Sequence, residues 1–94
     1  MPRCLSVSRA TVTPERESEY LATAGDLARA LEQRGQHLWV FRSDTDPGTF
    51  IEFSESPSAA SHRTRASRLP KEQRLEARLR ALASYAPDAW ALWE

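Results

Sequence analysis

The sequence predicts an α+β domain in which two helices cover one face of a four-stranded antiparallel sheet. Two segments, 14–34 and 71–86, repeat apolar residues at the four, three, four spacing of a helix with one buried face. Four other segments have the alternating or short aromatic composition of strands: 4–12, 36–42, 49–54 and 89–93. Two helices with one apolar face each can cover only one side of such a sheet.

Length and charge exclude several classes of protein. The chain has 94 residues, enough for one domain spanning 1–94. Its 13 basic and 13 acidic residues cancel, which argues against a protein built to hold nucleic acid or an acidic membrane. The single cysteine, Cys4, permits no internal disulfide, and the longest apolar run is the five residues 89–93. We therefore expect a cytoplasmic protein with no membrane span and no export signal.

The first helix is predicted to begin at Pro14 and to end at Arg34. Thr13 is a residue type that caps free backbone N–H groups, and proline is preset for the first helical position. Gly35 provides the stop. The face expected to be buried carries Tyr20, Ala24, Leu27 and Leu31.

The segments 36–42 and 49–54 are predicted to form a hairpin, because Ser-Asp-Thr-Asp-Pro-Gly between them is a turn sequence. We expect Arg42 to pair with Thr49. In that register one face is entirely apolar and belongs under the helices: Leu38, Val40, Ile51 and Phe53. The other face stays uncovered and carries His37, Trp39, Phe41, Phe50 and Glu52.

The second half of the chain is predicted to hold a loop, a helix and a strand. Residues 55–70 are rich in serine and form a loop with at most a weak helix within 58–66. The second helix begins at Lys71 and is ended by Pro87. Its buried face carries Leu75, Leu79, Leu82 and Ala86. The resulting order of strand, helix, strand, strand, helix, strand is that of the ferredoxin-like fold.

The uncovered face is the candidate functional site. Diagonal neighbours on a sheet lie about 7–8 Å apart at Cα, so His37 and Glu52 could reach each other. Such a pair suits general acid–base catalysis, because the carboxylate would orient an imidazole that titrates near neutral pH. A pair that merely satisfies two polar groups at an interface is the alternative.

The remaining residues of this face are expected to bind a ligand. Trp39, Phe41 and Phe50 supply aromatic surface, and Ser6 and Ser8 of the first strand complete the floor with Trp90 or Trp93. Exposing each large aromatic to water forgoes about 1.5–3 kcal/mol, so a covering is expected. The candidates are a second copy, a small molecule or RNA bases.

The order of elements, the length and the run GQHLWVFRSDTDPGTFIEFSES resemble the dimeric α/β-barrel superfamily over about residues 4–93. That superfamily includes antibiotic-biosynthesis monooxygenase-like, stress-responsive barrel and muconolactone isomerase-like proteins. The resemblance implies a homodimer whose sheets pack together, often around a small hydrophobic ligand. It also implies an enzymatic alternative, cofactor-independent oxygenation or isomerisation of an aromatic or polyketide-like compound. A purely structural interaction module is the remaining possibility.

Several kinds of ligand are not expected. Haem-degrading members of the superfamily use an asparagine, and this chain has none, so we expect no haem and no other cofactor. RNA-recognition domains need a stacking aromatic on the first strand, where this chain has Ser6, and the acids of the hairpin region would repel phosphate. Paired His or Cys ligands at metal spacing are absent from the sequence, so no metal site is predicted.

Overall fold

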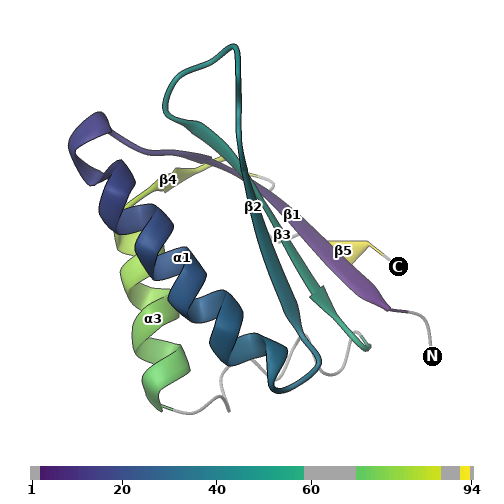
Figure 1. Ribbon diagram of the computed structural model, residues 1–94. Coiled ribbons are helices and arrows are strands. Elements are labelled where there is room, and N and C mark those ends of the chain that lie inside the picture. Colours follow the sequence, from purple (N-terminus) through teal and green to yellow (C-terminus); the bar gives the residue numbers. More distant parts are fainter. Residues whose placement is uncertain (1–2, 59–69, 88–91, 94) are drawn as a thin grey trace.

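The computed structural model describes residues 3–58, 70–87 and 92–93. The elements are, in chain order, β1 (Cys4–Thr11), a 3-10 turn η1 (Pro14–Arg16), α1 (Glu17–Glu32), β2 (His37–Arg42), β3 (Thr49–Ser56), α3 (Pro70–Ala81), β4 (Ser84–Tyr85) and β5 (Leu92–Trp93). Both helices lie on the same side of the sheet (Figure 1). Most of the predicted loop, 59–69, and the first three residues of the predicted last strand, 89–91, lie outside the described residues.

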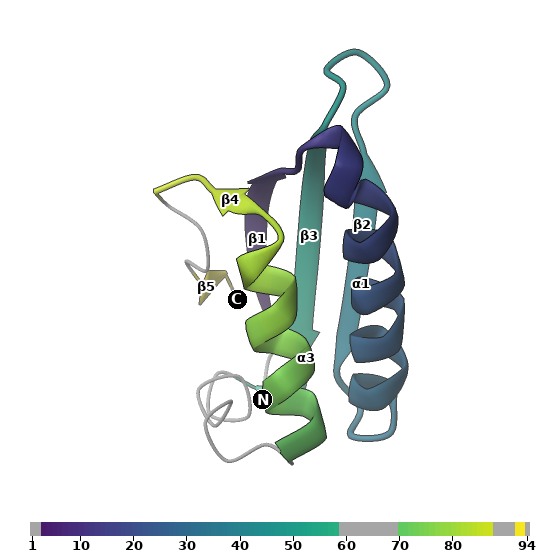
Figure 2. The same cartoon turned by 90° about the vertical axis from the view of Figure 1, so that its left-hand side faces the viewer.

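The sheet has the strand order β2-β3-β1-β4, and all its pairings are antiparallel. β4 pairs with the end of β1 at Ala10 and Thr11, whereas β5 pairs with its beginning at Leu5 and Ser6. Two short strands therefore occupy the position predicted for one, beside β1 (Figure 2). The order and the one-sided helices confirm the predicted ferredoxin-like fold.

The first helix buries the predicted stripe. Tyr20, Ala24, Leu27 and Leu31 are all buried, and they join Phe50 of β3 in the hydrophobic core. The predicted side-chain cap at Thr13 is wrong, because its side chain makes no capping hydrogen bond. The backbone N–H of Arg16 instead donates to the carbonyl of Thr13 at 3.0 Å, which closes the 3-10 turn before α1.

The second helix is shorter than predicted. It ends at Ala81, so the predicted stripe residues Leu82 and Ala86 lie beyond it. The N–H of Ala86 donates to the carbonyl of Arg9 at 3.1 Å, and Tyr85 pairs with Ala10. Pairing with the free side of β1 thus replaces the last turn of the predicted helix.

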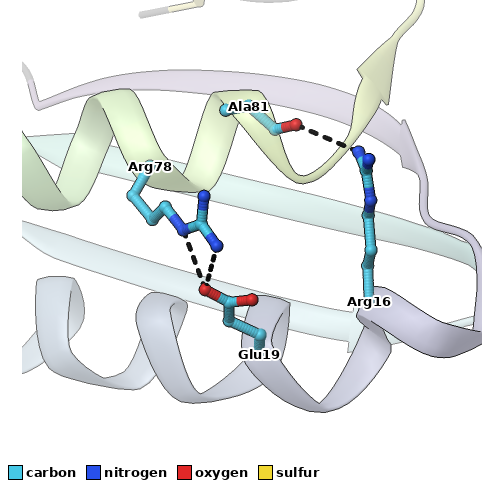
Figure 3. Close-up of polar contacts among 4 residues, drawn as sticks. All are labelled: Arg16, Glu19, Arg78 and Ala81. Atoms are coloured by element: carbon cyan, nitrogen blue, oxygen red, sulfur yellow. Dashed lines mark hydrogen bonds and ion pairs between the residues drawn. The ribbon is translucent and has the colours of Figure 1, made fainter.

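Polar contacts join the two helices on their outer side. The Arg78 Nε donates to the Glu19 Oε2 at 2.8 Å, and an Arg16 guanidinium N–H donates to the carbonyl of Ala81 at 3.5 Å (Figure 3). Near the other end of α3, Arg34 pairs with Glu72 at 2.8 Å, and Glu72 is only 2% exposed. A buried carboxylate needs such a partner to offset its lost hydration.

The register of the hairpin differs from the prediction by one residue. Arg42 pairs with Phe50 and not with Thr49. The N–H of Ser43 donates to the carbonyl of Thr49 at 2.9 Å, which takes one more residue from the turn into the ladder. Because side chains alternate along a strand, this shift moves every β3 side chain to the opposite face from the one expected.

The hairpin loop is fastened to the connection between β1 and η1. Gly48 has a φ of 82°, and its carbonyl accepts a 2.8 Å hydrogen bond from the N–H of Val12. A Cβ at position 48 would lie 2.8 Å from the Val12 carbonyl oxygen. Only glycine combines this backbone angle with so close an approach.

Candidate functional site

The residues predicted to form one site lie on two faces of the sheet. Phe50, Glu52, Ser6 and Ser8 are buried on the side that the helices cover. The opposite side, which we call the open face, carries mostly apolar residues together with polar ones such as His37, Arg9 and Glu55. Its apolar residues are Leu5, Val7, Trp39, Phe41, Ile51, Phe53 and Trp93. The prediction that Ile51 and Phe53 lie under the helices is therefore wrong, as is the prediction that Phe50, Glu52, Ser6 and Ser8 share a face with Trp39.

The predicted acid–base pair does not form. His37 lies on the open face, and the residue opposite it on the neighbouring strand β3 is Glu55. Its ring stacks on Trp39 at 5.0 Å between centroids and 6° between planes. Glu52 belongs to the covered face and is 6% exposed. With the sheet between them, imidazole and carboxylate cannot exchange a proton.

Glu52 instead accepts hydrogen bonds from two tyrosines. Tyr20 of α1 donates its hydroxyl to the Oε2 of Glu52 at 2.5 Å, and Tyr85 of β4 donates to the same oxygen at 2.7 Å. Burial above all, and then the adjacent Glu52 carboxylate, raise the pKa of both tyrosines well above the ordinary value. Both hydroxyls therefore remain protonated donors.

A small cavity adjoins this cluster between the helices and the sheet. Its volume is about 20 Å³, which is room for one water molecule. Ser8, Glu52 and Tyr85 contribute polar groups to its wall. The helical spacing predicted Tyr20 in the core but gave no sign of its contact with Glu52. The available signal was that a buried tyrosine needs a partner for its hydroxyl.

The open face carries three strongly exposed aromatic side chains. Trp39 is 43% exposed, Phe41 59% and Trp93 64%. At the end nearest the β2–β3 loop the face is hollowed, and the hollow has a volume of about 360 Å³. Its floor is Phe41, Ile51 and Phe53, and the two phenylalanine rings meet edge to face at 5.7 Å. The rim is formed by Arg9 and by the hairpin residues Arg42, Ser43, Thr45, Asp46 and Thr49.

The described ranges contain no group of three or more His, Cys, Asp or Glu side chains arranged to hold a metal ion. Neither helix in those ranges has the length and apolar character needed to cross a membrane.

Comparison with known proteins identifies related folds only among solved structures. No family model matches the chain, and no curated protein matches it. A variant of SnoaB, a cofactor-independent oxygenase from Streptomyces nogalater, is 21% identical with a TM-score of 0.70, covering 100% of this chain and 93% of that one. A candidate antibiotic biosynthesis monooxygenase from Chloroflexus aurantiacus is 19% identical with a TM-score of 0.73, covering 98% and 89%.

A conserved protein from Methanosarcina mazei has a TM-score of 0.79 at 13% identity, covering 100% of this chain and 93% of that one. These likenesses extend over nearly the whole of each chain. They confirm the predicted fold and the predicted resemblance to antibiotic biosynthesis monooxygenase-like proteins.

Proposed function

We propose, from the fold that this chain shares with antibiotic biosynthesis monooxygenase-like structures, that it is a homodimer whose open faces pack together and bind a small hydrophobic or aromatic molecule between them. The observation that carries this proposal is the exposure of Trp39, Phe41 and Trp93 on one continuous apolar face. A soluble single chain rarely leaves such a surface in water, because each large aromatic forgoes about 1.5–3 kcal/mol.

A second copy is the covering that best fits this face. A symmetric dimer requires a patch that complements itself, and a flat apolar sheet flanked by polar ends meets that requirement. One end carries the ion pair of Arg3 and Glu55, at 2.9 Å, and the other carries Arg9 and Thr11. Domains of this size also bury a small share of their surface alone, so association adds stability that the monomer lacks.

The hollow supports the ligand-binding part of the proposal. Its volume of about 360 Å³ falls within the range of about 300–1,000 Å³ typical of small-molecule pockets. Phe41 contributes to its floor, and Trp39 lies on the same face of β2. These two of the predicted ligand residues keep that role in the proposal.

Sedimentation equilibrium of Trp39→Asp tests the dimer. The wild type should sediment with twice the 10.6 kDa mass of the chain, and the variant with the mass of one chain. Burying an unpaired carboxylate in an apolar interface is strongly unfavourable. Leu21→Asp is the matched control, because Leu21 is 37% exposed on α1, on the other side of the molecule. A wild-type mass of 10.6 kDa at micromolar concentration would reject the dimer.

The second candidate function is cofactor-independent oxygenation or isomerisation of an aromatic or polyketide-like compound. The hollow favours it, because its floor of Phe41, Ile51 and Phe53 has room for an aromatic ring. SnoaB, which has this fold, is a cofactor-independent oxygenase.

Oxygen uptake with a panel of one- to three-ring phenols tests this second function. Wild type should accelerate uptake, and Phe41→Ala should reduce the acceleration because it removes a ring from the floor of the hollow. Leu21→Ala, on α1 on the other side of the molecule, is the control and should stay active. Full activity of Phe41→Ala would remove the hollow from the reaction, and the absence of any accelerated phenol would reject the oxygenase function.

A further inference from the structure

We infer that the hollow on the open face selects aromatic molecules that bear a carboxylate, and that Arg9 is the residue that pairs with it. This inference rests on the proposed function, because it names the class of ligand for the same site. It follows from the chemistry of the floor, the state of each charged group around the rim and the geometry of the guanidinium group.

The floor of the hollow recognises a flat apolar body. Phe41, Ile51 and Phe53 present two rings and one branched aliphatic chain from neighbouring strands. The edge-to-face contact of the two phenylalanines fixes their orientation, so the floor exists before a ligand arrives. An aromatic ring gains contact area on this floor without ordering any long side chain.

One positively charged side chain at the rim, that of Arg9, forms no ion pair within the described residues. Arg9 is exposed at the end of the open face, opposite Ile51. Among residues 3–58, 70–87 and 92–93, no carboxylate forms an ion pair with it. An arginine next to an apolar floor is therefore available to a ligand.

The other charged groups of the rim are already engaged. Arg42 pairs with Glu17 at 2.5 Å, and its guanidinium carbon lies 5.8 Å from the centre of the Phe50 ring on the covered face. Asp46 accepts a 3.0 Å hydrogen bond from the Thr49 hydroxyl within the loop. Asp46 keeps its negative charge, but its Oδ2 is held within the loop, so Arg9 is the cation at the rim that is open to a ligand carboxylate.

An arginine beside an apolar floor distinguishes ligands by charge as well as shape. A guanidinium matches a carboxylate through two parallel N–H···O bonds, which are stronger than bonds between neutral groups. A second copy over the open face would exclude water from the hollow and strengthen the attraction further. An aromatic acid contacts the apolar floor and pairs with Arg9 at the rim, whereas a neutral aromatic molecule contacts the floor alone.

Calorimetric titration with 2-naphthoate and its neutral isostere 2-naphthamide tests the inference. The wild-type protein should bind the acid about tenfold more tightly than the amide, and added salt should reduce the difference. Arg9→Gln should abolish that preference and leave the affinity for the amide within about twofold. Arg78→Gln is the matched control, because Arg78 is exposed on α3, on the other side of the sheet, and should keep the preference.

Each other outcome decides against the inference and separates it from the proposed function. Equal affinity for acid and amide would overturn the role of Arg9 and leave a hydrophobic site in place. Failure of both probes to bind would overturn the inference and the ligand-binding function together, while sedimentation would still report on the dimer. Conversion of ligand-free Arg9→Gln to monomers would assign Arg9 to the contact between copies and overturn the inference.

Discussion

The two faces of the sheet reverse the usual relation between burial and polarity. Most covered positions of β1 and β3 hold small polar residues or a carboxylate, namely Ser6, Ser8, Ser54, Ser56 and Glu52, and the others hold Cys4, Ala10 and Phe50. On the same strands the open face carries Leu5, Val7, Ile51 and Phe53, with Arg9 and Glu55 beside them. The helices supply much of the apolar surface of the core, so the core tolerates hydroxyl groups on the strands beneath them. An open face that is more apolar than the covered one is the composition expected of a surface with a partner.

The largest test of this contrast compares Phe50→Ala with Phe41→Ala in a Trp39→Asp background, which we expect to be monomeric. Phe50 is 0% exposed, and Phe41 is 59% exposed. Removing the buried ring should lower the free energy of unfolding by about 3–5 kcal/mol. Removing the exposed ring should change it by less than about 1 kcal/mol. Urea unfolding measures both, and similar losses would contradict the register described here.

Alkaline titration provides the second test, because both tyrosines of the chain belong to the covered face. Their pKa values are raised in the folded state, so above about pH 10 the unfolded chain releases two protons that the folded chain keeps. Stability is therefore full below pH 10 and should fall by about 1.4 kcal/mol per tyrosine for each pH unit above it.

Absorbance at 295 nm checks this directly. Phenolate should appear only as the chain unfolds, and Tyr85→Phe should halve the pH dependence. A titration near pH 10 in the folded protein would show that one hydroxyl is open to water, which would contradict the covered cluster.

A smaller effect is expected from Tyr20→Phe. The substitution keeps the ring but removes one of the two tyrosine donors to Glu52, which should cost about 1.5–3 kcal/mol because the acceptor is charged. In a Glu52→Gln background the same change should cost about 1 kcal/mol or less, since a neutral amide loses less. Thermal or urea unfolding of the four proteins measures the coupling, and an additive result would contradict a charged acceptor.

The smallest effect concerns the polar contacts on the outer side of the helices. Arg78→Ala removes the ion pair between Arg78 and Glu19. The two side chains are 54% and 51% exposed. Such pairs contribute about 0.2–1 kcal/mol, and 0.5 M salt should erase most of the difference between variant and wild type. A larger, salt-independent loss would mean that these contacts, and not the core, fix the helix layer on the covered face.

The sequence pattern predicted the fold well because each element has a local signal. The four, three, four spacing from Tyr20 to Leu31 identified α1 and its buried face, and alternation identified the strands. The end of α3 was mispredicted, because Leu82 and Ala86 continue the helical spacing while the chain there pairs with β1. A spacing rule cannot detect a distant strand that competes for the same backbone groups.

The site was predicted less well because it depends on the register of the hairpin. The turn sequence permits Arg42 to pair with Thr49 or with Phe50, and a one-residue shift exchanges the two faces. Apolarity then favoured the wrong choice, since Ile51 and Phe53 are better core residues than Glu52 and Ser54 in isolation. Tyrosine hydroxyls from α1 and β4 help to make the buried carboxylate acceptable, and they are 32 and 33 residues away along the chain.

The bond between Gly48 and Val12 has a consequence for ligand entry. It fastens the residue before β3 to the residue after β1, next to the hollow, so this side of the hollow is held in place before a ligand binds. Binding of a ligand then loses no free energy to ordering that side of the hollow. Affinity should therefore depend closely on the size of the ligand, since an opening that is held in place cannot widen for a larger one.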